Sequence, residues 1–129
     1  MPQVKIYGLR SQLDSHRDAL SEAIHAALQS AFGTPENKRF QRFIALEPED
    51  FIFPGDRSSN YTIIEILAFE GRSDEAKRSL IRDLFANIEA ATGITSQDIE
   101  IVLIETPASN WGIRGQLGSE LTLSYSTNI

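Results

Sequence analysis

The first half of the chain has apolar residues in two different spacings. The segment 4–7 predicts an opening strand, which residues 8–12 interrupt. From 14 to 32, apolar residues recur every three or four positions, which is typical of a helix with one buried face. Gly33 predicts the end of this helix, and the segment 39–46 reads as a second strand.

The second half repeats this order of patterns. An apolar segment at 61–69 predicts a strand, and Ser73 is placed to cap a helix that ends at Gly93. The segment 100–104 predicts a fourth strand. Beyond it the chain is rich in glycine, with a short alternating pattern at 121–125 that is compatible with one more strand.

The two halves are therefore versions of one β-α-β unit. The repeats cover about residues 2–48 and 61–107, followed by a tail at 108–129, and we expect residues 1–129 to form a single domain. Each unit should have parallel strands joined by a right-handed crossover. The predicted fold class is α+β, with a four-stranded sheet and two helices on one face.

One face of this sheet would lack a cover. Residues 63–67 and 101–104 are largely apolar, so these strands place apolar side chains on both sides of the sheet. Two helices on one face leave the other face open to water, which soluble monomers rarely tolerate over a large area. Closure by the tail is one solution. The tail is short and polar, however, so we expect a second copy of the chain to cover this face.

Composition excludes several classes of function. The formal charge is −6, which disfavours nucleic acid as a partner, and no cysteine is present to form disulfides or thiolate metal sites. No apolar run reaches the length of a membrane span, and we expect a cytoplasmic protein without a signal peptide. His16 and His25 share the first helix without a carboxylate at metal-ligand spacing, so no metal site is expected.

Pro2 is the first candidate for chemistry. If Met1 is removed, Pro2 becomes a secondary amine at the start of a buried strand. Burial and nearby cations both lower the pKa of an amine, so this nitrogen could exchange protons at neutral pH. The alternative is that Pro2 is only a chain end.

Several short motifs, in their order and spacing, extend this hypothesis. They are Phe32-Gly33-Thr34-Pro35, Arg39-Phe40-Gln41, Arg57-Ser58-Ser59, Gly71-Arg72-Ser73, Gly93-Ile94-Thr95 and Asn110-Trp111-Gly112. With Pro2 and the duplicated unit, they resemble the tautomerase superfamily, in the branch of malonate semialdehyde decarboxylase and related uncharacterised tautomerases. The resemblance implies the tautomerase fold, a homotrimer and a pocket around Pro2 near a subunit boundary. It implies no cofactor.

The resemblance also suggests roles for individual residues. Arg72 matches an arginine that holds a substrate carboxylate in such enzymes, and its guanidinium fork suits two carboxylate oxygens. Trp111 and Ile113 fall in the segment that supplies an apolar wall. Arg39 belongs to one of the matching motifs. Read without the resemblance, Arg72 is a turn residue, Trp111 a core residue and Arg39 a surface charge.

Departures from the family pattern bear on the reaction. The decarboxylase has a second arginine where this chain has Glu70, and an aspartate where this chain has Lys38. Lys38 would supply a second positive charge or, as part of a polar turn, lie in solvent; Arg114 is another possible anion contact.

The expected function is therefore that of an isomerase, a keto-enol tautomerase. Pro2 would act as general acid and base on a small 2-oxo acid or its enol. The alternatives are a lyase that decarboxylates, or a hydratase, acting on a 3-oxo or unsaturated acid, and a trimeric binding protein without catalysis.

Overall fold

The computed structural model describes residues 2–123 and 125–129. Whether Met1 is removed lies outside the described residues. The main elements are β1 (Gln3–Leu9), α1 (Arg10–Phe32), β2 (Gln41–Leu46), β3 (Thr62–Phe69), α2 (Asp74–Thr92) and β4 (Ile99–Thr106). The tail adds β5 (Gly112–Ile113) and β6 (Gln116–Leu117), and single 3-10 turns are η1 (Pro48–Asp50), η2 (Ser96–Asp98), η3 (Ala108–Asn110) and η4 (Gly118–Glu120).

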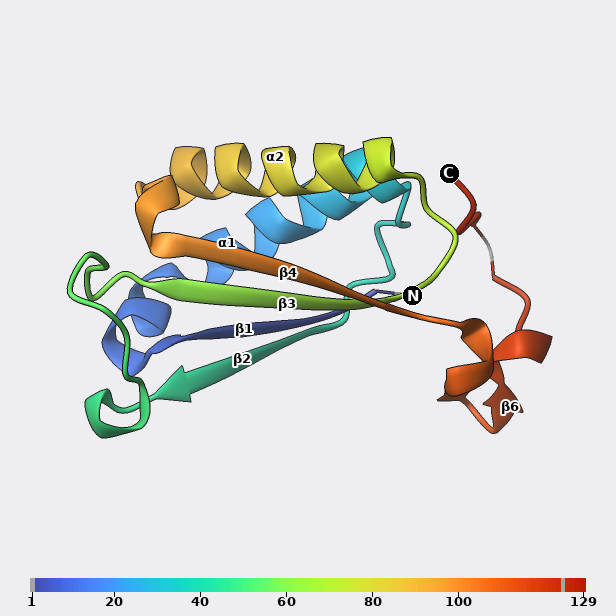
Figure 1. Cartoon of the computed structure of the whole chain (residues 1–129), viewed down its shortest axis with the longest axis horizontal. Helices are drawn as coiled ribbons and strands as arrows, with labels where there is room; N and C mark the ends of the chain where they lie inside the picture. Colours follow the sequence, from blue (N-terminus) through green and yellow to red (C-terminus); the bar gives the residue numbers. More distant parts are fainter. Residues whose placement is uncertain (1, 124) are drawn as a thin grey trace.

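Four strands form one mixed sheet in the order β2-β1-β3-β4. Within each β-α-β unit the strands are parallel, and the two units join through the antiparallel pair β1–β3. Both helices lie on the same face of the sheet (Figure 1). The prediction of an α+β fold built from a duplicated β-α-β unit is confirmed.

The start of α1 differs from the prediction. The helix begins at Arg10, directly after β1, and its N-cap residue Leu9 makes no side-chain capping bond. Ser15 lies inside the helix and donates from Oγ to the Ser11 carbonyl at 3.2 Å. Gly8 does not break the strand, since β1 continues to Leu9, and a Cβ added to Gly8 would come within 3.2 Å of the Leu13 side chain.

The other helix ends follow local chemistry. The Ser73 side chain accepts a hydrogen bond from the Ala76 amide at 3.1 Å and caps α2 as predicted. Gly33 and Gly93 adopt left-handed φ angles of 65° and 78°, which end the two helices with little steric cost.

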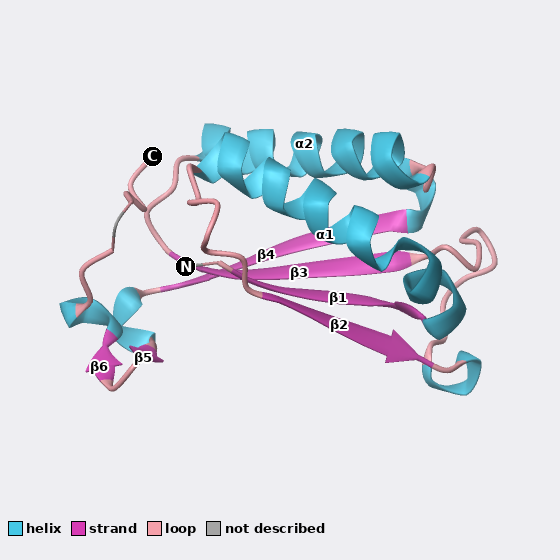
Figure 2. Ribbon diagram, turned by 180° about the vertical axis from the view of Figure 1, so that it is seen from behind, coloured by secondary structure: helices cyan, strands magenta, loops and turns pink. Residues whose placement is uncertain are grey.

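The hydrophobic core lies between the helices and the sheet. Its fully enclosed side chains include Ile6, Leu13, Leu20, Ile24, Ile64, Ile66, Leu80, Leu84 and Ile88. On the opposite face of the sheet, Val102 and Ile104 are 46% and 38% exposed. Seen from the other side in Figure 2, this open face lies beneath the strands, away from the helices.

The tail does not cover the open face. Its small hairpin, β5 and β6, stands beyond the end of β4 (Figures 1 and 2). The sequence pattern was also compatible with one more strand at 121–125. That prediction is wrong for the residues described there, 121–123 and 125, which lie outside any strand. Over the described residues, neither helix is long and apolar enough to cross a membrane.

Replacing Ile64 by Ala should lower the free energy of unfolding by about 2–5 kcal/mol, because a fully buried β3 side chain would leave a cavity. Urea denaturation measures this change. Ile52→Ala is the matched control: that side chain is 92% exposed, so its loss should change stability by less than about 0.5 kcal/mol. Equal effects of the two substitutions would contradict the assignment of the core.

Replacing Gly118 by Ala should disturb the open end of the tail hairpin, opposite its turn. The Gly118 amide donates to the Trp111 carbonyl at 2.7 Å, and an added Cβ would overlap the Ala108 carbonyl oxygen. We expect a loss of about 1–3 kcal/mol in unfolding free energy and a changed emission of Trp111, the single tryptophan.

Gly112→Ala is the control for Gly118→Ala. Gly112 lies in the same hairpin, and a Cβ added to it would have no atom within 4 Å. Unchanged emission and stability in Gly118→Ala would show that position 118 tolerates a side chain.

Candidate functional site

The sheet topology brings three of the predicted site residues to one end of the molecule. Because β1 runs antiparallel to β3, with Gln3 opposite Leu67, Pro2 lies beside the carboxyl end of β3. Arg72 follows β3 by three residues, and Trp111 follows the neighbouring parallel strand β4. Figure 1 shows the amino terminus beside the point where β3 and β4 leave the sheet.

Pro2 is buried at this end of the sheet. The strand β1, which follows Pro2, is bonded to the segment before β2, since the Val4 amide donates to the Phe40 carbonyl at 2.9 Å. The polar turn that leads into β2 therefore also reaches this end of the molecule. A strand start held on both sides gives the Pro2 ring a defined position.

Arg72 is an unusual buried cation. Only 5% of the residue is exposed, and its guanidinium carbon lies 4.4 Å from the centre of the Phe32 ring. One nitrogen, Nη1, donates to the Phe69 carbonyl at 3.1 Å. The other two, Nε and Nη2, are buried without a hydrogen-bond partner among the described residues.

The charge of Arg72 is not neutralised by an ion pair with any described residue. Burial lowers the pKa of its guanidinium, and the nearby Tyr125 hydroxyl and Glu105 carboxylate oppose that change. Glu105 is itself bound by Lys77, at 2.8 Å from Oε1 to Nζ. Arg72 thus keeps both charge and hydrogen-bonding capacity for an anion.

Trp111 forms one wall of a pocket next to the start of β1. Its Nε1 donates to Thr106 Oγ1 at 2.7 Å, and its ring packs edge-on against Phe69 with centroids 5.1 Å apart. The pocket has a volume of about 440 Å³ and is lined by Gln3, Leu67, Thr106, Asn110, Trp111 and Gly112. These contacts hold the indole in one orientation beside the pocket.

The other predicted site residues form no side-chain hydrogen bond or ion pair with Pro2 or Arg72 in the described part of the chain. Arg39 is held toward α1, with Nη1 2.7 Å from Glu22 Oε1 and 3.2 Å from Ser21 Oγ. Lys38 is half-buried and forms no ion pair within the described residues. Ile113 lies in β5, and Arg114 occupies the hairpin turn with a φ of 52°.

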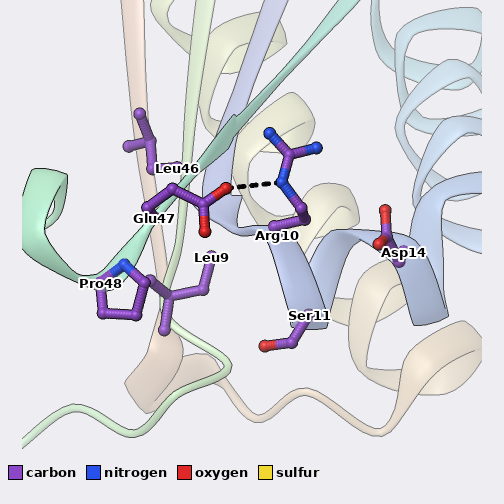
Figure 3. Close-up of a pocket in the computed structure, with 7 residues that line it drawn as sticks. All are labelled: Leu9, Arg10, Ser11, Asp14, Leu46, Glu47 and Pro48. Atoms are coloured by element: carbon purple, nitrogen blue, oxygen red, sulfur yellow. Dashed lines mark hydrogen bonds and ion pairs between the residues drawn. The ribbon is translucent and has the colours of Figure 1, made fainter.

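A second pocket lies at the opposite end of β1, away from Pro2. Figure 3 shows its lining residues Leu9, Arg10, Ser11, Asp14, Leu46, Glu47 and Pro48, around about 400 Å³. Its cation is already engaged, because Arg10 Nε lies 2.7 Å from Glu47 Oε1. We therefore place the candidate site at the Pro2 end.

Both histidines are on α1 and bond to backbone carbonyls rather than to residues of this site. His25 is buried and hydrogen-bonds through Nε2 to the Glu36 carbonyl at 3.0 Å. His16 contacts the Gln12 carbonyl in the preceding helical turn. The described residues contain no cluster of three or more side chains suited to hold a metal ion.

The sequence interpretation missed Tyr125, which the structure places near Arg72. The alternating pattern of the tail suggested only a strand there. No local motif joins Tyr125 to Arg72, because the two residues are far apart in the chain and meet only when the tail folds back.

Comparison with known sequences connects this geometry to a family. The family described as Tautomerase enzyme matches residues 38–114, more than half of the chain. A probable tautomerase of Staphylococcus saprophyticus is 36% identical over 53 residues, 41% of this chain and 87% of that protein. The 2-hydroxymuconate tautomerase of Comamonas testosteroni is 33% identical over 57 residues, 44% of this chain and 90% of that protein.

Solved structures match over nearly the whole chain. Malonate semialdehyde decarboxylase is 25% identical, with a TM-score of 0.80, and covers 93% of this chain and 99% of its own. Native fused 4-OT, at 22% identity, has a TM-score of 0.80 over 92% of this chain and 98% of its own. Together with the duplicated β-α-β fold, the family match shows that this chain belongs to the tautomerase family.

Proposed function

We propose that the protein is a cofactor-independent tautomerase acting on a small 2-oxo acid or its enol. Pro2, freed by removal of Met1, is the general acid and base, and Arg72 binds the substrate carboxylate. The observation that carries this proposal is the buried, unpaired guanidinium of Arg72 at the same end of the sheet as Pro2.

The proposed reaction moves one proton from oxygen to carbon. The neutral Pro2 nitrogen accepts the proton of the enol hydroxyl, and the C–O bond becomes a carbonyl. The electrons of the C=C bond move to the carbon that does not bear the oxygen. The protonated amine then delivers the proton to that carbon, which restores the neutral nitrogen. Burial of Pro2 and the positive charge of Arg72 favour the neutral amine at the start of this cycle.

Other residues would hold the substrate in place. The Arg72 guanidinium contributes two free donors to a carboxylate and opposes charge that develops on the substrate. Trp111 and Ile113 exclude water from the reacting carbon. Lys38 is the candidate for a second positive charge at the site. Arg39 would act indirectly, since its contact with Glu22 holds the segment that leads into β2.

Similar proteins support this class of chemistry. Relatives are named as 2-hydroxymuconate tautomerases, whose name denotes a carboxylate-bearing enol substrate. Malonate semialdehyde decarboxylase is described with decarboxylase and hydratase activities and with a variant of its first residue, a proline, to alanine. Its match over 93% of this chain makes decarboxylation or hydration the second candidate function. Glu70 and Lys38, which depart from its pattern, favour tautomerisation.

We also propose that the chain assembles as a homotrimer in the cytoplasm. A fused 4-OT of the same fold forms a symmetric trimer. The open sheet face of this chain, with Val102 and Ile104, would be buried in such an assembly. A trimer without catalytic activity is the alternative that the following measurements would reveal.

Replacing Pro2 by Ala should lower kcat/KM for a 2-oxo acid enol by at least about 100-fold, because a primary amine in a different geometry replaces the base. The conversion of 2-hydroxymuconate, followed by its absorbance, provides the assay. Product analysis with 3-oxo acids separates tautomerisation from decarboxylation.

Intact mass of the protein supplies the control for Pro2→Ala. Fractions that retain Met1 have an amide at the Pro2 nitrogen and should be inactive. Full turnover by Pro2→Ala, or by protein whose mass includes Met1, would refute the role of Pro2.

Replacing Val102 by Glu should disrupt the homotrimer, because the new charge would be buried between subunits. Sedimentation velocity should change from the trimer mass to the monomer mass. Ala86→Glu introduces the same charge on the exposed face of α2 and should leave the mass unchanged. A trimeric Val102→Glu variant would show that this face is not the interface.

A further inference from the structure

The end of the chain folds back over Arg72. The Ser73 hydroxyl donates to the Ile129 carbonyl oxygen at 3.0 Å, which fixes the tail beside the start of α2. Gly71, with a φ of 129°, lies so close that an added Cβ would be 2.5 Å from Asn128 Oδ1. The two views in Figures 1 and 2 agree that the carboxyl terminus lies next to the first turn of α2.

This arrangement brings Tyr125 to the guanidinium. The Tyr125 hydroxyl and Arg72 are close enough for each to change the pKa of the other. A weak hydrogen bond between them contributes to both pKa changes, although the buried hydroxyl makes no hydrogen bond of ordinary geometry with any described residue. Burial raises the pKa of Tyr125, with Arg72 opposing, so the hydroxyl is protonated at neutral pH and can donate.

Three buried donors therefore remain unsatisfied at one place. They are Nε and Nη2 of Arg72 and the hydroxyl of Tyr125. Buried polar groups without partners are rare and costly, which indicates that a ligand completes them. Donors from two side chains match the acceptor oxygens of a carboxylate.

A space lies beside Tyr125, and Arg72 is not among the residues that line it. It has a volume of about 350 Å³, and its lining includes Phe69 from β3 and Leu121, Leu123 and Tyr125 from the tail. The volume is sufficient for a small acid. Phe69 also packs against Trp111, which lines the other pocket at this end of the sheet.

We propose that Tyr125 is the second ligand of the substrate carboxylate, donating a hydrogen bond to the anion that Arg72 binds. The proposal rests on the proposed function, in which Arg72 is the anion site. Tyr125 would do the work of the second arginine that Glu70 replaces, with a neutral donor in place of a charge.

The charges around the site are compatible with an anion. Glu105, the nearest acid to influence Arg72, is bound by Lys77 at 2.8 Å, and Asp74 lies 3.5 Å from the same ammonium group. Lys77 therefore offsets one of these two negative charges. A neutral tyrosine adds a contact without changing the charge balance.

The test measures binding rather than turnover, in the full chain with Pro2→Ala. Titration calorimetry with pyruvate, the smallest 2-oxo acid, should show about 10-fold weaker binding for Tyr125→Phe and at least 100-fold weaker binding for Arg72→Ala. Methyl pyruvate, which lacks the carboxylate, should bind weakly and equally to all variants. Circular dichroism confirms that each variant is folded.

Tyr61→Phe is the matched control, since it removes a tyrosine hydroxyl near the start of β3, at the other end of the strand. It should bind pyruvate like the parent. If Tyr125→Phe also binds like the parent while Arg72→Ala does not, the role of Tyr125 is refuted and the proposed anion site stands.

Two other outcomes are distinct from this one. Equal loss of pyruvate and methyl pyruvate binding in Tyr125→Phe would assign the hydroxyl a structural role and refute its role as a carboxylate ligand. Pyruvate binding that survives Arg72→Ala, or is absent from the parent, would refute the proposed anion site itself, and the role of Tyr125 with it.

Discussion

The antiparallel pairing of β1 with β3 is the contact on which the site depends. Each β-α-β unit alone has parallel strands, so its first strand starts at the end where its second strand also starts. Joining two units through antiparallel first strands reverses one of them. The start of β1 then meets the ends of β3 and β4, and Pro2 comes to lie at the same end as Arg72 and Trp111.

A buried guanidinium is stable here because several weak contacts replace water around it. The guanidinium carbon lies over the Phe32 ring, and the Phe69 carbonyl accepts one hydrogen bond. These contacts hold the side chain in position but leave two donors unused. In a medium of low polarity, an unsatisfied cation attracts an anion more strongly than an exposed one does. The same burial that costs folding energy thus favours ligand binding.

The open face of the sheet extends the same reasoning to assembly. Alternating side chains on β4 direct Leu103 to the helices and Val102 to the other face. The helices cover only one face, and the tail packs at the end of the sheet. The exposed Val102 and Ile104 make part of this open face apolar, and the ion pair of Lys5 with Glu65, the register partner of Val102, makes part of it polar.

Sequence patterns alone determined much of this protein. Spacing predicted both helices and all four strands of the sheet, since burial on one face imposes a period that local composition reveals. Ser73 and the glycines after each helix marked real boundaries. Pro2, Arg72 and Trp111 were identifiable because family motifs are local in the chain.

Only the tertiary structure decided how these residues meet. The helix α1 starts at Arg10, and Gly8 packs close to Leu13 there, a contact that no pattern in the strand reveals. Arg39 has its charge engaged by Glu22 from a helix, which its place in a motif did not indicate. Tyr125 reaches Arg72 because the tail folds back onto α2, and contacts between distant segments depend on packing in space rather than on local sequence.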